Sequence, residues 1–405
     1  MKKFVALLII ICLVFGAAIT YTGCGANDAE PAVTPEPSVE PSEDVSAADT
    51  ASVPQLDFEA LRASHDADEV VMTIDGEDVT WEEYFYWLYY SGVQVNNYIN
   101  QMASYMAAYG MDISWDDAAD DTGVSFKDYV VQLAEENIRQ IRSIKKFASE
   151  NGVTLTSDNL KAIEEQRKTD MENICGSEVS DEEFAAKLME AYYLPEKVYN
   201  DMNEINYLYQ NCFAKLYGEN GELADDALAE KYLEDNGYLN ATHILLMTID
   251  PSTGEALDDT VVAEKQAKAA ELAAELAAIK DVEELKTRFA ELKQEYCEDT
   301  GKEAYPDGYV FTPGTMVTEF EDTVKALNDY EVSEPVLSRY GYHIIMRLPV
   351  TVDTVLKTSD AGTELTARAL AANQEYGEKL DACYDDMEVV FNGDFENFSI
   401  EAFIK

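Results

Sequence analysis

Two of the three histidines in the sequence lie in short apolar segments, and the chemistry of the protein is expected there. His243 lies in LNATHILL, residues 239–246, and His343 lies in YGYHIIMRL, residues 340–348. Aliphatic and β-branched residues fill both segments, and turn or helix signals bound them, so each predicts a buried strand. A buried imidazole loses its hydration unless its ring nitrogens find partners. If the two strands are neighbours, the rings can satisfy each other's hydrogen-bonding needs. The pair would then either belong to a polar functional site or be only hydrogen-bonded histidines of the core.

Two helices are predicted between these strands, over 259–280 and 281–299, before a turn-rich segment that leads to the second histidine. The motifs follow in the order histidine on the first strand, FAELKQEYCED, an aromatic residue before a glycine turn, GTMVTEFEDTVKAL and EVSEPVLSRYGYHII. Their order and spacing resemble the parvulin peptidyl-prolyl isomerase domain. The resemblance implies a domain over 239–350 of βαααβαββ type, with a four-stranded antiparallel sheet.

The resemblance also implies a site, residue by residue. Its catalytic, polar part is formed by His243, Asp299, Ser338 and His343. Its substrate-binding part is a proline-ring pocket of Met316 and Phe320, with Phe311 as a wall. No cofactor and no metal ion are expected.

Two positions depart from the pattern of the parvulin domain. Where those domains have a Gly-Gly-Asp-Leu-Gly loop, this sequence has Tyr-Pro-Asp-Gly-Tyr at 305–309. The leucine that lines the pocket is therefore missing, and Tyr309 is its candidate replacement on the substrate-binding side. Cys297 stands at a position usually held by serine, which is a milder change because both groups are small and form hydrogen bonds.

The reaction that this site would catalyse needs no covalent step. Amide resonance gives an X-Pro bond a barrier of about 20 kcal/mol, so uncatalysed exchange is slow. An apolar socket would hold the proline ring while polar groups favour the twisted amide over both planar forms. The loop 247–265 is acidic and has no arginine, so a phosphorylated residue before the proline is not expected to be required. The alternative is that the polar residues only hold the fold and that the domain binds proline-containing chains without turnover.

The N-terminus predicts export and attachment to a membrane. Lys2 and Lys3 precede an apolar run over 4–19, which is typical of a signal peptide over 1–23. The following Cys24 resembles the lipid-attachment cysteine of a bacterial lipoprotein; an uncleaved membrane anchor is the alternative. Residues 24–55 are rich in Pro, Glu, Ser, Ala, Thr and Asp, and they predict an extended, disordered tether.

Composition excludes several classes of partner. The formal net charge of −51 disfavours binding to nucleic acid and to anionic lipid headgroups. Five acidic residues between 112 and 121 lack EF-hand spacing, so a solvated loop is predicted rather than a calcium site. Apart from Cys12 and Cys24, the cysteines are far apart and predict free buried thiols, with a disulfide as the alternative.

Residues 56–238 predict a helical domain that opens with two short strands around an Asp75-Gly76 turn. Thr80 and Glu83 predict a capping box, and Tyr84, Trp87, Leu88 and Val95 then recur at helical spacing and indicate a buried stripe. Further helices are predicted over 126–151, 157–173, 180–191, 195–217 and 224–236. This opening resembles the secreted parvulin chaperones of the PrsA and SurA type. In that family a C-terminal helix returns to the N-terminal domain, and here a last helix is predicted over 363–387, within a segment 351–405.

The sequence therefore predicts an α+β foldase that is lipid-anchored on the extracytoplasmic face of a Gram-positive type cell membrane. Its partners would be unfolded or newly secreted polypeptides with X-Pro bonds. The first alternative is a holdase chaperone with an inactive parvulin domain. The second is a solute-binding lipoprotein, which would need two α/β lobes around a cleft, whereas the residues before 237 lack alternating strands and helices.

Overall fold

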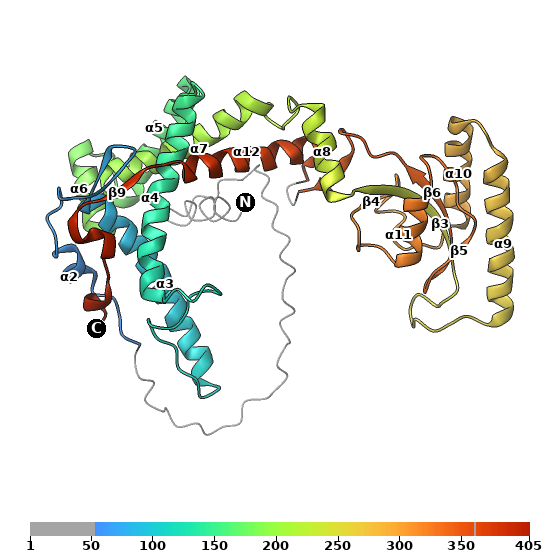
Figure 1. Cartoon of the computed structure of the whole chain (residues 1–405), viewed down its shortest axis with the longest axis horizontal. Helices are drawn as coiled ribbons and strands as arrows, with labels where there is room; N and C mark the ends of the chain where they lie inside the picture. Colours follow the sequence, from blue (N-terminus) through green and yellow to red (C-terminus); the bar gives the residue numbers. More distant parts are fainter. Residues whose placement is uncertain (1–52, 360–361) are drawn as a thin grey trace. The chain divides into compact units, whose positions relative to one another are not determined.

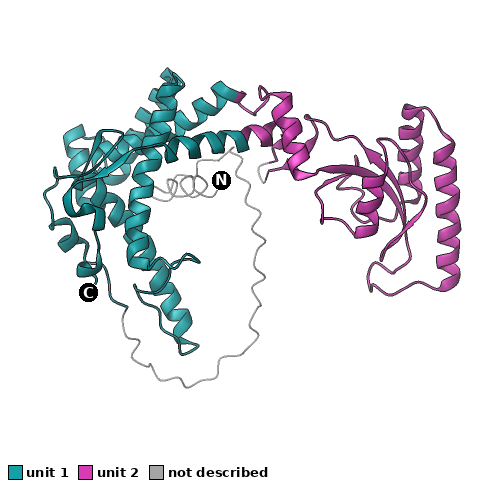
Figure 2. Ribbon diagram, in the orientation of Figure 1, with its two compact units in different colours: residues 1–216, 374–405 teal, residues 217–373 magenta. Residues whose placement is uncertain are grey.

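The computed structural model describes residues 53–359 and 362–405 (Figure 1). The signal peptide, Cys24 and almost all of the tether lie outside the described residues. Among the described residues, no helix combines the length and the apolar character that crossing a bilayer requires. The chain divides into two compact units, 1–216 with 374–405, and 217–373 (Figure 2). These edges differ from the predicted domain edges at 238/239 and 350/351, which stay predictions.

The first unit contains a three-stranded antiparallel sheet of order β2-β1-β9. Strands β1 (Val70–Ile74) and β2 (Glu77–Thr80) form the predicted hairpin. Asp75 and Gly76 have φ of 50° and 79°, as a tight two-residue turn requires. Strand β9 (Val389–Phe391) pairs with the other edge of β1, so the C-terminal segment completes the sheet.

Helix α3 (Trp81–Ala107) follows the hairpin directly. The side chain of its N-cap residue, Thr80, accepts a hydrogen bond from the Glu83 N–H, as predicted. The second half of the predicted capping box is wrong, because the Glu83 carboxylate instead binds Arg142 at 2.9 Å and Lys197 at 3.1 Å. A buried guanidinium needs a carboxylate partner because its charge would otherwise be left unpaired. The predicted stripe of α3 is confirmed as core, and these residues are at most 5% exposed: Tyr84, Trp87, Leu88 and Val95.

The predicted helices of the N-terminal region are confirmed with small shifts at their ends. They are α4 (Phe126–Glu150), α5 (Ser157–Cys175), α6 (Asp181–Tyr192), α7 (Glu196–Tyr217) and α8 (Asp226–Asn236), and one short helix that was not predicted, α2 (Phe58–Arg62), precedes the hairpin. Side-chain caps begin several of them, and the glycine after α8 ends it in the left-handed conformation, as its Asn-Gly sequence predicts.

The C-terminal helix, α12 (Ala367–Asp385), begins later than predicted. Residues 363–366 were expected in this helix, but Glu364–Thr366 forms strand β8, which pairs with β7 (Val355–Thr358). The sequence Thr-Glu-Leu-Thr at 363–366 is compatible with either a helix or a strand. Pairing with strand β7 makes it a strand. Short 3-10 helices, η2 (Gly393–Asn397) and η3 (Glu401–Phe403), follow β9.

The second unit is built on a four-stranded antiparallel sheet of order β4-β3-β6-β5. Its strands are β3 (Leu239–Met247), β4 (Tyr309–Phe311), β5 (Val336–Leu337) and β6 (Gly341–Leu348). The predicted α+β class and this sheet are confirmed. One detail of the βαααβαββ pattern is wrong, because only α9 (Asp259–Ala278) and α10 (Val282–Tyr296) lie between β3 and β4, and turns replace the third helix.

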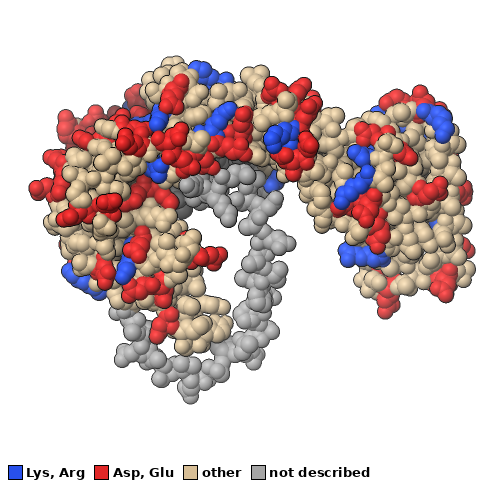
Figure 3. Space-filling model, in the orientation of Figure 1, with Lys and Arg blue, Asp and Glu red and all other residues tan. Residues whose placement is uncertain are grey.

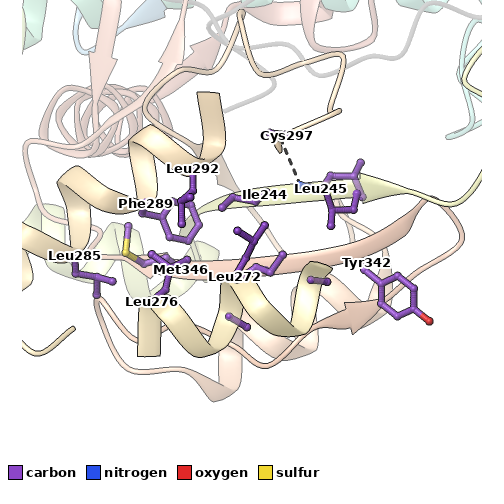
Figure 4. Packing of buried hydrophobic residues seen from close by; sticks show 14 residues of the cluster. Ile244, Leu245, Leu272, Leu276, Leu285, Phe289, Leu292, Cys297, Tyr342 and Met346 are labelled. Atoms are coloured by element: carbon purple, nitrogen blue, oxygen red, sulfur yellow. Dashed lines mark hydrogen bonds between the residues drawn. The ribbon is translucent and has the colours of Figure 1, made fainter. Parts of the chain in front are cut away.

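Each face of this sheet is covered by helix. Figure 4 shows the packing on one face, where Leu272 of α9 and Phe289 of α10 meet Ile244 of the sheet. On the other face, helix α11 (Thr318–Ala326) supplies Phe320 to a smaller cluster that includes Ala241 and Ile345. His243 and His343 have the side-chain direction of Ala241 and Ile345 because strand residues two apart share a face. The fold therefore directs both histidines to the α11 side of the sheet.

Candidate active site

The two histidines meet across the central strand pair. Strands β3 and β6 are antiparallel neighbours, and the register pairs His243 with Ile345 and Leu245 with His343. The two Nδ1 atoms are 3.2 Å apart, and the histidines are only 7% and 3% exposed. The expectation that the two strands are neighbours and that the rings satisfy each other is confirmed.

The four residues predicted for the polar site form one row of hydrogen bonds. Asp299 Oδ2 lies 2.9 Å from His243 Nε2 at one end of the row. Ser338 Oγ lies 2.7 Å from His343 Nε2 at the other end. Asp299 and Ser338 come from loops after α10 and after β5, so the sheet alone does not place them. The structure thus brings all four predicted residues together.

One order of protons satisfies every member of the row. An ionised Asp299 can only accept, so His243 donates its Nε2–H to it. If His243 is neutral, its Nδ1 then accepts from the Nδ1–H of His343, and His343 Nε2 accepts from the Ser338 hydroxyl. Ser338 Oγ in turn accepts from the backbone N–H of Tyr340 at 3.1 Å. The row leaves no ring nitrogen without a partner.

The charges at the site agree with this order. The hydrogen bond from His243 holds the pKa of Asp299 far below its usual value, and bonds from Tyr309 and the Gly301 N–H add to this against the effect of burial. Burial lowers the pKa of His343 to about 3, and the neighbouring His243 adds to the lowering. Asp299 is therefore the fixed negative charge of the site, and His343 is neutral at ordinary pH.

The segment 297–299 is tied to strand β3, which places Asp299 beneath His243. Cys297 Sγ accepts from the Leu245 N–H at 3.4 Å and donates to the His243 carbonyl at 3.7 Å. The Glu298 N–H donates to the Leu245 carbonyl at 2.8 Å. Cys297 thus makes backbone hydrogen bonds of the kind that the small side chain expected at this position would make.

Cys297 and the other three described cysteines, at 175, 212 and 383, are free thiols, and Cys175 is only partly buried.

The Tyr309 hydroxyl is bound to Asp299, which the sequence did not indicate. It donates to Asp299 Oδ2 at 2.6 Å, and the Tyr309 ring lies 5.6 Å from the His243 ring. Burial and the charge of Asp299 both raise the pKa of this phenol, which keeps it a donor. Gly301 makes room for the hydroxyl, since a Cβ there would lie 2.4 Å from the Tyr309 oxygen. The predicted role of Tyr309 in binding substrate stays a prediction.

Lys293 holds the unusual 305–309 loop in place, and sequence reasoning missed it. Its Nζ donates to the carbonyls of Tyr305 at 3.2 Å and Pro306 at 3.0 Å, and to Thr242 Oγ1 at 3.2 Å. The residue is 8% exposed, and burial lowers its pKa. The sequence does contain an indication of this burial. Lys293 lies four residues after Phe289, and therefore on the apolar side of the predicted helix.

The residues predicted for the proline pocket lie against the histidines. The Phe320 ring is 5.3 Å from the His243 ring and 5.7 Å from the His343 ring, nearly edge-on to both. The Phe311 ring lies 5.9 Å from the Phe320 ring, and the partly buried Met316 packs against the same cluster. Their role in holding a proline ring stays a prediction. In the part of the chain that is described, no cluster of three His, Cys, Asp or Glu side chains is placed to hold a metal ion.

Comparison with known proteins gives the class of this domain. Residues 243–348 match the family described as Rotamase: PPIC-type PPIASE domain, so this segment is a parvulin-type domain. It begins at one of the paired histidines and contains the other.

Parts of the chain are similar to PrsA foldases and to a SurA chaperone. Foldase protein PrsA 1 of Bacillus cereus is 57% identical over 58 residues, which are 14% of this chain and 20% of that protein. Foldase protein PrsA of Oceanobacillus iheyensis is 31% identical over 194 residues, 48% of this chain and 55% of that protein. Chaperone SurA of Chromohalobacter salexigens is 52% identical over 58 residues, 14% and 13% of the two chains. The matches thus span at most about half of these relatives.

The solute-binding alternative does not fit the described architecture. It requires two α/β lobes, whereas the first unit is helical with a small antiparallel sheet, and the strands of the second unit form only antiparallel pairs.

Proposed function

We propose that the protein is a peptidyl-prolyl cis/trans isomerase that assists the folding of secreted polypeptides. The observation that carries the proposal is the row of hydrogen bonds from Asp299 through His243 and His343 to Ser338, with Phe320 edge-on to both rings. The match of residues 243–348 to the PPIC-type domain supports it.

The residues of the row form no covalent bond with the substrate. They act through their fixed positions and through the electric field of their dipoles and of the Asp299 charge. Catalysis requires that the twisted amide be bound more tightly than either planar form. Phe320 and Met316, with Phe311 behind them, hold the proline ring against the histidine pair. The pair is locked by its hydrogen bonds, so it presents fixed dipoles and the charge of Asp299 to the amide without reorganising. His343 is neutral and fully bonded, and it does not act as a general base.

The anchoring and location of the protein follow from the N-terminal sequence. Export through the signal peptide and lipid attachment at Cys24 would hold the protein on the extracytoplasmic face of the cell membrane, with the residues up to 55 as a tether. The helical unit before and after the isomerase domain would bind unfolded chains with X-Pro bonds. Neither the site nor this unit needs a cofactor or nucleic acid.

A protease-free prolyl-isomerisation assay tests the proposal. The full chain without its signal peptide is compared with Asp299→Ala on unphosphorylated proline peptides. The wild type should accelerate exchange, and the variant should lose at least about tenfold, which corresponds to 1.4 kcal/mol of transition-state stabilisation. A folded wild type that gives no acceleration would instead support the holdase alternative.

A further inference from the structure

The second half of helix α3 is an exposed surface without charge. Between Glu83 and Asp112 the sequence has no Asp, Glu, Lys or Arg, although 27% of the chain is charged. Burial explains this only up to Ile99, which is the last fully buried residue of the helix. Exposed helix faces are ordinarily charged or polar, so an uncharged exposed face indicates a surface that meets a partner.

Aromatic and methionine side chains cover this face. Tyr98, Tyr105 and Tyr109 are 49%, 60% and 65% exposed, and Met111 just beyond the helix is 48% exposed. Tyr98, Met102 and Tyr105 follow at spacings of four and three residues, which places them in one stripe of α3, and Tyr109, two residues past the end of the helix, continues the stripe. The rings of Tyr105 and Tyr109 are 5.2 Å apart. We call this stripe, with Met111, the α3 tip.

An acidic loop adjoins the α3 tip. All five carboxylates of the loop are exposed: Asp112, Asp116, Asp117, Asp120 and Asp121. Among the described residues, Lys127 forms an ion pair with this loop, binding Asp116 at 2.6 Å, and it also binds Glu401 at 3.3 Å. Figure 3 shows this end of the first unit as uncharged side chains with acidic ones beside them. The surface is therefore apolar at its centre and negative at its edge.

We propose that the α3 tip binds unfolded polypeptide segments in which lysine or arginine alternates with apolar side chains. The proposal rests on the proposed function, and it names the class of client that the helical unit takes. Tyrosine faces attract cations as well as apolar groups, and flexible methionine adapts to many shapes, so the surface suits varied sequences. The adjacent carboxylates select clients by charge.

Charge argues against the other occupants of such a surface. A second copy of the chain would bring the same five carboxylates to the contact, on a molecule whose formal net charge is −51. An anionic lipid surface would be repelled in the same way. A cationic, unfolded chain is the occupant that the aromatic stripe and the acidic loop both favour.

The test uses a proline-free, unstructured peptide of lysine, phenylalanine and serine, and a second peptide with glutamate in place of lysine. Fluorescence anisotropy measures their binding to the full chain without its signal peptide. The lysine peptide should bind at least about tenfold more tightly, and its affinity should fall as salt is added. Because neither peptide contains proline, binding at the isomerase site does not mask the result.

Three variants locate the binding site. Tyr105→Ser with Tyr109→Ser should weaken binding of the lysine peptide about tenfold, through lost apolar contact. Asp112→Asn with Asp121→Asn should weaken it less and should reduce its salt dependence. Leu160→Ser is the matched control, since Leu160 is 55% exposed on helix α5, and it should leave binding unchanged. Circular dichroism should show all variants folded, because the altered side chains are exposed.

Two results would overturn the proposal: equal binding of the two peptides, or unchanged binding in both tip variants. Wild-type dimers that the tyrosine variant dissociates in sedimentation would make the tip a self-association surface instead. Prolyl isomerisation, measured on the same variants, should stay at the wild-type rate. If the isomerase proposal fails, the isomerisation assay shows it, and the peptide-binding measurement is not affected. The two proposals can therefore fail separately.

Discussion

Asp299 is the residue on which the electrostatics of the site depend. It accepts hydrogen bonds from His243, Tyr309 and the Gly301 N–H, and these donors together keep it ionised although it is largely buried. Its charge fixes the tautomer of His243, and through His243 it fixes that of His343. A change at any donor to Asp299 should therefore be detected at both rings.

Tyr309→Phe removes one of these donors and nothing else. The pKa of Asp299 should rise, because a hydrogen bond to its charged form is lost. Isomerisation should fall about fivefold, in line with a hydrogen bond worth about 1 kcal/mol. Kinetics and a carboxyl NMR titration measure the two effects. Tyr305→Phe is the control, since Tyr305 is 52% exposed, and it should change neither quantity. An unchanged Asp299 titration in Tyr309→Phe would show that the phenol does not hold the carboxylate.

His343 makes the stability of the second unit depend on pH. Burial lowers its pKa to about 3 in the folded chain, against about 6.5 when unfolded. The unfolded state therefore binds the proton first as pH falls, so this contribution is complete above pH 6.5 and is lost progressively towards pH 3. The slope is at most about 1.4 kcal/mol per pH unit.

Hydrogen exchange of β3 and β6 amides at pH 5 and pH 7 measures this loss. Protection should be lower at pH 5 after correction for the intrinsic exchange rate. His343→Gln cannot titrate, and it should show a smaller difference between the two pH values. The same difference in both proteins would place the pH dependence on groups other than His343.

Helix α10 positions the site from two points on its surface. Its C-terminal end delivers Cys297 and Asp299 to strand β3, and its last turn carries Lys293 to the carbonyls of the 305–309 loop. The loop that departs from the parvulin pattern is thus held by a charged side chain of the helix. The hydrogen bonds from Lys293 and from the Tyr309 hydroxyl together stabilise a loop in which other residues stand at the usual glycine positions.

Lys293→Met should release this loop. The substitution keeps the apolar part of the side chain but leaves two carbonyls and the Thr242 hydroxyl without a donor. The unit should lose about 2 to 4 kcal/mol of stability, and proteolysis within 305–309 should become faster. Urea unfolding and limited proteolysis measure these effects. Lys286→Met is the control on the same helix, because its pair with Glu283 lies at the surface, and it should change the stability little. Equal stability loss in the two variants would refute the special role of Lys293.

Sequence patterns predicted elements well where a local cause decides them. Capping residues and helical spacing located α3 to α8, and apolar runs located β3 and β6. Residues 363–366 were missed because only the partner strand β7 makes them a strand. The polar row was predicted because its residues match a known motif. The contacts of Lys293 and Tyr309 were not, because they join side chains to groups that only the tertiary fold brings near.

At the scale of the whole molecule, the two ends of the described chain build one sheet and one aromatic core. Strand β9 pairs with β1, and Phe395 and Phe398 lie 6.0 Å and 5.5 Å from the Trp81 ring. The His65 ring lies 4.7 Å from Phe395, so the third histidine serves the core of this unit and has no part in the polar row. The first unit therefore depends on residues from both ends of the sequence, whereas the sheet and site of the second unit come from one continuous segment.

Deletion of residues 386–405 should destabilise the first unit and leave the second unit folded and active. The first unit loses β9 and the aromatic cover of Trp81, so its melting temperature should fall by several degrees or more. Tryptophan fluorescence reports this unit alone, because all three tryptophans, at 81, 87 and 115, lie in it. Isomerisation of a short proline peptide should persist, since every residue of the polar row remains. Val390→Ser is the control, because Val390 is 52% exposed on β9, and it should change the melting temperature little. A deletion that abolishes isomerisation of the short peptide would show that the site needs the first unit to be intact.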